Sequence, residues 1–296
     1  MTTILRVTHT PPTFEVPRGA CDCHTHIFGP ADKFPYANTR RYTPGDASIA
    51  DLEALHRALH IDRVVIVHPS PYAADNAVTL DALRRLSARA RGVAVIDEKT
   101  TDRELADMHA VGVRGVRVNL ESYGENDPAI AARALRQVAE RVAPLGWHVQ
   151  TFTRLGVVAA LHDVIMALPA TLVIDHFGKP QAAAGLKQPG LDRLLALLRS
   201  GKVYVKVSAA YRISEIADYP DAAPIARAMI EANPDRIVWG TDWPHPSGGP
   251  RSNPSVIEPF RPEDDGAALN RLAGWTRSRE ELQKILVDNP ARLYQF

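Results

Sequence analysis

Residues 236–246 read RIVWGTDWPHP, a short apolar run that ends in polar residues, among them Asp242. A β-branched run followed by Gly, Asp and Pro is typical of a buried strand that leads into a loop. Near the other end of the chain, residues 21–30 read CDCHTHIFGP and repeat this arrangement. His24 and His26 stand two positions apart there, so an extended strand would place both side chains on one face. The two stretches predict a first and a last strand that both carry polar groups at their ends.

Six further strand candidates lie between these two stretches, and together they predict the fold class. They are DRVVIV (62–67), GVAVI (92–96), VRGVRV (113–118), WHVQTF (147–152), TLVID (171–175) and VYVKVS (203–208). Segments with apolar residues at helical spacing, such as NAVTLDALRRLSARA and LDRLLALLRS, separate them. Eight strands that each precede a helix predict an α/β protein with a (β/α)8 TIM barrel. An open doubly wound sheet is the competing fold, but no GxGxxG follows an early strand.

The length of 296 residues suits one barrel domain, which we place at residues 20–296 after an N-terminal arm at residues 1–19. The 35 basic and 34 acidic residues nearly cancel, so neither a nucleic acid nor a membrane surface is an expected partner. No run approaches the roughly 20 apolar residues of a membrane span, and the first twenty residues lack a signal-peptide pattern. We therefore expect a cytoplasmic protein, either a monomer or a small homo-oligomer.

In barrels of this type, functional groups sit where the strands end and the loops to the helices begin. Polar side chains occupy these positions on most of the expected strands. They include His24, His26, His68, Ser70, Arg117, Asn119, Gln150, Asp175, His176, Lys206, Ser208, Arg212 and Asp242. A purely structural barrel would place apolar or small residues there. The ring of polar groups therefore predicts an active site.

Three short motifs in this ring resemble those of one known family. They are HTH at residues 24–26, VIDHFGKP at residues 173–180 and WGTDWPHP at residues 239–246. In an eightfold alternation of strands and helices, these motifs resemble the amidohydrolase superfamily. Within it, the chain is similar to the amidohydrolase-related branch that hydrolyses lactones, typified by 2-pyrone-4,6-dicarboxylate lactonase. The resemblance covers about residues 20 to 296 and implies an amidohydrolase-like barrel.

The resemblance implies hydrolysis of the ester bond of a small anionic lactone, either similar to 2-pyrone-4,6-dicarboxylate or derived from a sugar acid. Asp242 would take a proton from the attacking water, and His24, His26 and His176 would polarise the lactone carbonyl. Two alternatives stay open. One is an isomerase that moves the acyl group of a sugar-acid lactone between hydroxyls. The other is a hydrolase or decarboxylase of the same superfamily that holds one zinc ion.

The expected fifth strand bears on the question of a metal. Most metal-dependent members of the superfamily carry a histidine at its end, where this chain has Phe152, while His148 lies at its start. A phenyl ring cannot bind such an ion. The branch that the chain resembles works without a divalent metal, so we expect no cofactor. The alternative is one Zn²⁺ held by His24, His26 and Asp242, with His176 as a fourth candidate ligand.

Two arginines are the expected anchors of the substrate anion. The resemblance matches Arg117 and Arg212 to carboxylate-binding positions, with Tyr42 and Ser70 as helpers. The fork of a guanidinium suits a carboxylate because it donates two parallel hydrogen bonds. Six residues after Arg117, where the lactonase carries another arginine, this chain has Tyr123, close to Glu121. That departure favours a lactone with one carboxylate or several hydroxyls, with Tyr123 at the substrate.

Overall fold

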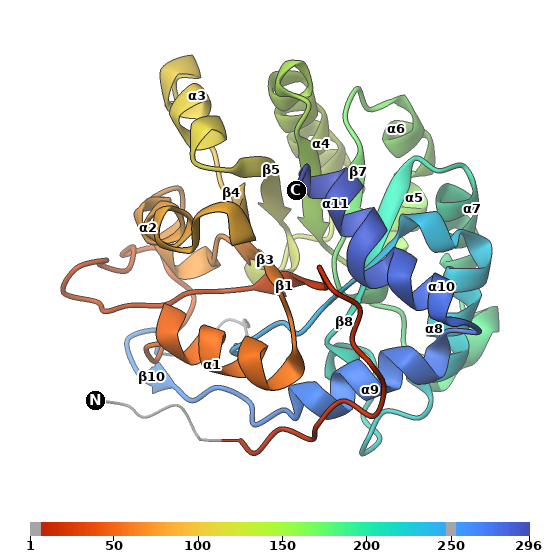
Figure 1. The fold of residues 1–296 in the computed structure, drawn as a ribbon. Coiled ribbons are helices and arrows are strands. Elements are labelled where there is room, and N and C mark those ends of the chain that lie inside the picture. Colours follow the sequence, from red (N-terminus) through yellow and green to blue (C-terminus); the bar gives the residue numbers. More distant parts are fainter. Residues whose placement is uncertain (1–6, 247–252) are drawn as a thin grey trace.

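The computed structural model describes residues 7–246 and 253–296, and eight parallel strands form its centre (Figure 1). Their order in the sheet follows the chain, from β1 through β3 to β9. The strands are β1 (Cys21–Thr25), β3 (Arg63–Val67), β4 (Ala90–Ala94), β5 (Val113–Asn119), β6 (His148–Phe152), β7 (Leu172–Ile174), β8 (Val203–Ser208) and β9 (Ile237–Gly240). A bridge between Thr25 and Trp243 joins the two ends of the sheet. The predicted (β/α)8 barrel is confirmed.

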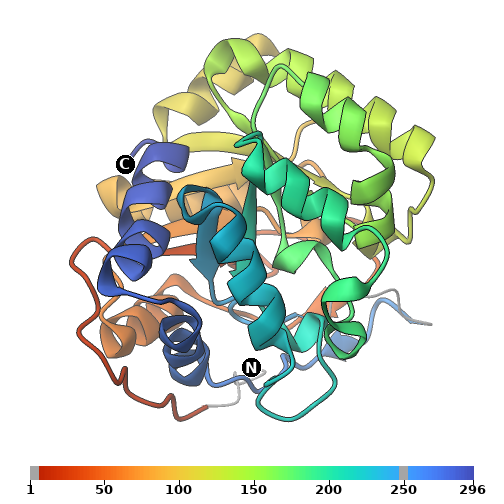
Figure 2. The ribbon, with the colours of Figure 1, turned by 90° about the vertical axis from the view of Figure 1, so that its right-hand side faces the viewer.

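Helices surround the strands, as the view in Figure 2 shows. They are α1 (Ile49–Leu59), α2 (Ala77–Leu86), α3 (Asp102–Ala110), α4 (Pro128–Val142), α5 (Leu155–Ala160), α6 (His162–Ala167), α7 (Leu191–Arg199), α8 (Ala222–Ala232), α9 (Asp265–Trp275), α10 (Arg279–Gln283) and α11 (Asn289–Tyr294). Side-chain caps fix where several of them begin. Ser48 and Asp51 form a reciprocal capping box at the start of α1. In the described parts of the chain, no helix has the length and apolar character that crossing a bilayer requires.

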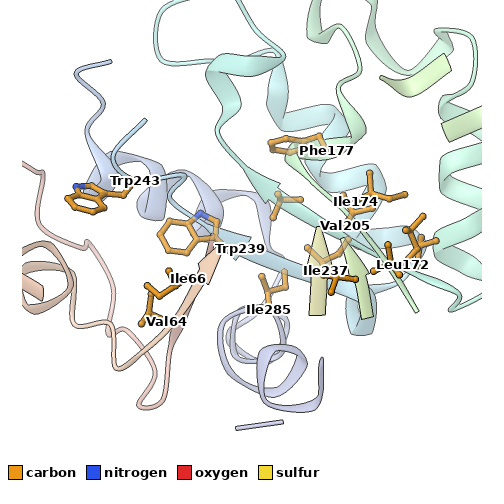
Figure 3. Packing of buried hydrophobic residues seen from close by; sticks show 14 of the residues in the cluster. Val64, Ile66, Leu172, Ile174, Phe177, Val205, Ile237, Trp239, Trp243 and Ile285 are labelled. Atoms are coloured by element: carbon orange, nitrogen blue, oxygen red, sulfur yellow. The ribbon is translucent and has the colours of Figure 1, made fainter. Parts of the chain in front are cut away.

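Alternate residues of the strands face two different apolar layers. One layer lies between the sheet and the helices, and Figure 3 shows part of it, including Val64, Ile66, Leu172, Ile174, Val205, Ile237 and Ile285. The other layer fills the barrel interior and consists of Cys21, Cys23, Val65, Val67, Val93, Val173, Tyr204, Val238 and Tyr294. Both cysteines are buried and unpaired. The interior is thus packed with side chains, and only its mouth is polar.

Two segments outside the barrel cover its mouth and one side. The short strands β2 (Thr43–Pro44) and β10 (Ile257–Glu258) pair in parallel and join the loop after β1 to the loop after β9. The N-terminal segment runs along α9, where the backbone amide of Thr10 donates to Asp264 over 2.9 Å. The division into an arm at 1–19 and a barrel at 20–296 remains a prediction, and residues 1–6 of that arm lie outside the described residues.

Candidate active site

Four predicted catalytic side chains converge at the mouth of the barrel. The Nε2 atoms of His24, His26 and His176 lie 3.5, 3.6 and 3.7 Å from Oδ1 of Asp242. All four side chains are buried, with residue exposures of 3% or less. Three strand ends, those of β1, β7 and β9, supply them. One carboxylate oxygen therefore faces three imidazoles.

Neighbours in the two end motifs hold this cluster in place. A Cβ at Gly240 would lie 2.6 Å from the backbone nitrogen of His24, so glycine lets β9 pack tightly against β1. The amide of Asp242 then donates to the carbonyl of His24 over 2.9 Å. Beneath them, the buried carboxylate of Asp22 accepts bonds from the amide and the hydroxyl of Thr241 over 2.9 and 2.7 Å. The conformation of the WGTD segment is thus set by the first strand.

The two oxygens of Asp242 have different surroundings. Oδ2 accepts hydrogen bonds from the hydroxyl of Tyr211 over 2.6 Å and from Nε of Arg212 over 2.8 Å. Oδ1 has no hydrogen-bond partner in the described part of the chain. Burial alone would raise the pKa of Asp242, but Arg212 and His176 outweigh it and hold that pKa well below its usual range. The carboxylate is therefore ionised, with one oxygen hydrogen-bonded and the other without a partner among the described residues.

The hydrogen bond that Nδ1 of each histidine makes decides whether its Nε2 is a donor or an acceptor. Nδ1 of His26 lies 2.8 Å from the carbonyl of Val67, which can only accept, so the proton sits on Nδ1. Nδ1 of His176 lies 2.9 Å from the hydroxyl of Ser208, which can donate or accept. Burial lowers the pKa of His24 to about 3 and also lowers the pKa values of His26 and His176. Nε2 of a neutral His26 thus presents a lone pair toward Asp242. This arrangement suits a hydrogen-bond acceptor better than the predicted role, in which His26 donates a hydrogen bond to the lactone carbonyl.

Nδ1 of His24 has a charged neighbour inside the barrel. The ammonium of Lys206 lies 3.3 Å from it and donates to the carbonyl of Cys23 over 2.8 Å and to the side chain of Gln150 over 2.7 Å. Oδ1 of Asp175 lies 3.3 Å from the same nitrogen. The motifs placed Lys206 and Asp175 at the strand ends but gave no sign that both would contact His24.

The positions of the donors suit a single metal ion. The ligand atoms of His24, His26 and Asp242 lie within 4.8 Å of one another, as do those of a second set, His24, Asp175 and His176. Phe152 stands at the strand end where metal-dependent members of the superfamily carry a further histidine ligand. Its ring lies edge-on to His176, with the ring centroids 5.0 Å apart. His148 lies at the other end of β6.

The protonation and charge of the same groups do not suit a metal ion. A histidine that binds a metal normally donates its other ring N–H to an acceptor. Nδ1 of His24 is in hydrogen-bonding geometry with the ammonium of Lys206, whereas the equally near Oδ1 of Asp175 is not hydrogen-bonded to it. Asp175 is paired with Arg117 and Lys206, over 3.6 and 3.5 Å, and Asp242 with Arg212 over 2.6 Å. Three cations thus meet two carboxylates. A divalent cation would add to a positive charge that is already buried.

The predicted substrate-binding residues fall into two groups. Arg117 is buried, and its Nε has no hydrogen-bond partner in the described part of the chain. Tyr42 is buried beside Ser70, to which it is hydrogen-bonded, and close to Arg117. Arg212, by contrast, is bound to Asp242 and donates to the carbonyl of Pro246 over 2.9 Å. Arg117 is therefore the arginine with an unpartnered donor, its Nε, among the described residues.

The rim of the site carries Tyr123, which was the predicted substrate contact, and the acidic Glu121. Tyr123 is 45% exposed, with the guanidinium of Arg41 5.8 Å from its ring centroid. Glu121 accepts from Lys179 over 2.5 Å and from Arg154 over 3.0 Å. Lys179 and Arg154 had no predicted role, although each follows the end of a strand, β7 and β6 respectively. The acidic Glu121 thus neutralises basic groups at the outer edge.

Three known relatives resemble the chain along nearly its whole length. It is 38% identical to a 2-pyrone-4,6-dicarboxylate hydrolase of Comamonas testosteroni, over 96% of this chain and 92% of the relative. It is 37% identical to a 4-sulfomuconolactone hydrolase of Rhizobium radiobacter, over 98% and 94%. It is also 28% identical to a D-galactarolactone isomerase of Agrobacterium fabrum, over 99% and 97%. The resemblance to the lactone-hydrolysing branch is confirmed.

Structure and family comparisons agree with these relatives. A crystal structure of an Agrobacterium tumefaciens protein superposes with a TM-score of 0.83 and 28% identity, covering 97% of each chain. The model of the amidohydrolase family matches residues 21–296, which includes all eight barrel strands. With its HTH and GTDWPH motifs brought together at the barrel mouth, the chain belongs to the amidohydrolase family.

Proposed function

We propose that this protein hydrolyses the ester bond of a small anionic lactone. The observation that carries the proposal is the buried carboxylate of Asp242, whose free oxygen faces His24, His26 and His176. Two of the relatives are named as hydrolases of lactones that carry acidic groups, a pyrone dicarboxylate and a sulfomuconolactone. Both the site and the relatives therefore support a lactonase.

In the proposed reaction, a water molecule lies between Asp242 and His26. Oδ1 of Asp242 and Nε2 of His26 both accept, so they can orient the two hydrogens of the water. The water oxygen then bonds to the lactone carbonyl carbon while its proton passes to Asp242. His24 donates to the carbonyl oxygen as that oxygen gains negative charge. Collapse of this intermediate breaks the bond to the ring oxygen, which leaves and takes up the proton.

Charge at the site favours an anionic substrate. Arg117, Lys206 and Arg212 outnumber Asp175 and Asp242 by one unit, as the pairs described above show. A substrate with one carboxylate would balance that excess in a buried site. Because Glu121 already pairs with Lys179 and Arg154 at the rim, we propose a single carboxylate in the preferred substrate.

We propose that the reaction needs no cofactor. The position of Lys206 beside His24 and the positive charge of the cluster both favour this choice. The alternative is one Zn²⁺ on His24, His26 and Asp242, which would supply carbonyl polarisation and a more acidic water.

A second candidate activity is isomerisation of a sugar-acid lactone, which the similarity to the galactarolactone isomerase favours. The two reactions differ in their products. Hydrolysis at neutral pH opens the ring and releases one proton per turnover, whereas isomerisation releases none. A pH-indicator assay across pyrone carboxylates, muconolactones and sugar-acid lactones therefore finds substrates of a hydrolase, and chromatography of the products finds an isomerase.

The role of Asp242 is tested with Asp242→Asn, which keeps the shape of the side chain and removes the base. We expect kcat to fall by about 10²- to 10⁴-fold, the usual contribution of a positioned base, with the fold retained by circular dichroism. Asp163→Asn is the matched control, since that side chain is exposed on α6. Wild-type turnover in Asp242→Asn on a confirmed substrate would rule out the assignment.

A further inference from the structure

Lys206 is a fully buried lysine inside the barrel, and the proposed reaction gives it no role. Its side chain is 0% exposed, and β8 places it directly below the histidine cluster. Burying an ammonium is costly unless each of its three N–H groups finds an acceptor. Two of them donate to the carbonyl of Cys23 and to Oε1 of Gln150. The partner of the third N–H indicates the role of Lys206.

The acceptor in hydrogen-bonding geometry with that third N–H is Nδ1 of His24, 3.3 Å away. Oδ1 of Asp175 lies 3.5 Å from the same ammonium and 3.3 Å from Nδ1 of His24, but it is not in hydrogen-bonding geometry with either group. Gln150 fits this arrangement, because its oxygen faces the ammonium while its NH₂ donates to Asp175 over 3.1 Å. An imidazole nitrogen that accepts from a lysine carries no proton itself. The proton of neutral His24 is then on Nε2.

We propose that Lys206 fixes the proton of His24 on Nε2, so that His24 is a hydrogen-bond donor to the substrate and not a metal ligand. Nε2 of His24 lies 3.5 Å from Oδ1 of Asp242 and has no hydrogen-bond partner among the described residues, so its N–H remains available to a substrate. A metal ion on Nε2 would require the proton to move to Nδ1. That N–H would then face the N–H of Lys206 over 3.3 Å.

His26 provides the contrast inside the same cluster. Its Nδ1 donates to the carbonyl of Val67, so its Nε2 is an acceptor, the arrangement that metal-binding histidines have. The two histidines of the HTH motif therefore hold opposite tautomers. His24 donates and His26 accepts. Lys206 is in this sense a positioning residue, which acts on the reaction through His24.

Only the donor role of His24 toward the lactone rests on the proposed function. The tautomer itself can be measured without substrate, by NMR of protein labelled with ¹⁵N-histidine. We expect protonated Nε2 and unprotonated Nδ1 for His24, and the reverse for His26, with the two signals assigned through a His26→Gln variant. A proton on Nδ1 of His24 would overturn the proposal, whether or not a lactone is hydrolysed.

A second test replaces the lysine. In Lys206→Met, the third donor is gone, Asp175 can accept from Nδ1 of His24, and Nε2 becomes free to bind a metal. We expect zinc to bind this variant about 10- to 100-fold more tightly than wild type, the usual scale for the partner of a metal-binding histidine. Competition with a chromogenic chelator measures this affinity.

Lys202→Met is the matched control, because Lys202 lies just before β8 and donates to the carbonyl of Leu168, away from the histidines. Its affinity for zinc should equal that of wild type. Equal affinity in Lys206→Met and wild type, with a native circular dichroism spectrum, would contradict the inference. If Lys206→Met fails to fold, the histidine spectrum of wild type still decides the question.

Discussion

The predicted role of Arg117 in binding the substrate anion can be tested by replacing it with methionine. Arg117→Met keeps the length and apolar body of the side chain and removes its charge. In the structure, Nη2 of Arg117 lies 3.6 Å from Asp175, while its Nε lacks a partner among the described residues. Because the side chain is buried, a substrate carboxylate bound there would lose a charge-assisted bond with no water to replace it. That bond is worth about 2–3 kcal/mol.

Such a loss corresponds to about a 30- to 150-fold fall in kcat/KM for a lactone that carries a carboxylate. The methyl ester of the same lactone has no charge to lose and should fall much less. Steady-state kinetics on this pair of substrates measures the difference. The thermal unfolding midpoint of the variant should be recorded as well, since Asp175 loses one of its two cations.

Arg154→Met serves as the control, because Arg154 is 58% exposed and bound to Glu121 at the rim. An exposed ion pair of this kind contributes little, so kcat/KM should change by less than about threefold. Equal losses on the acid and its methyl ester in Arg117→Met would refute the reasoning. Arg117 would then support Asp175 and the fold instead of holding the substrate.

Two further outcomes follow from the charge and burial of the site. After prolonged treatment with a strong chelator and elemental analysis, turnover should stay within about twofold of untreated enzyme. A loss of activity that added zinc restores would contradict the metal-free reaction. Between pH 7 and pH 5, the free energy of unfolding should fall by about 2 kcal/mol for each of His24, His68 and His148. Burial lowers the pKa of each to about 3, so below pH 6.5 protons bind mainly to the unfolded chain. Urea unfolding at the two pH values measures the fall, and an unchanged midpoint would contradict it.

The pattern of the sequence predicted all eight strands, but it misplaced some of their ends. The third expected strand illustrates why. Residues 92–96 were the expected strand, whereas β4 covers Ala90–Ala94. The amide of Val95 bonds to the side chain of Asn76 over 2.9 Å and so leaves the sheet. The spacing of apolar residues predicts which positions are buried. It does not predict that a side chain, here that of Asn76, binds a backbone amide in place of the neighbouring strand.

The candidate site was predictable to the level of residue identity and no further. Motifs placed His24, His26, His176 and Asp242 at strand ends, and the barrel brings them within 3.5 to 3.7 Å. Which ring nitrogen carries each proton depends on Val67 and Lys206, which come from other strands. These partners are set by the register of the barrel, and a linear motif does not contain that information.

The pairing of Arg212 with Asp242 has a consequence for the substrate. An arginine that donates to Oδ2 over 2.8 Å keeps Asp242 ionised and oriented, but it also makes the carboxylate a weak base. A weak base can serve only where the carbonyl is readily attacked and the leaving oxygen is stable as an anion. Enol lactones meet both conditions, because the departing enolate spreads its charge, and saturated alkyl lactones do not. The electrostatics of Asp242 therefore favour an acidic enol lactone over a sugar-acid lactone as the substrate of this site.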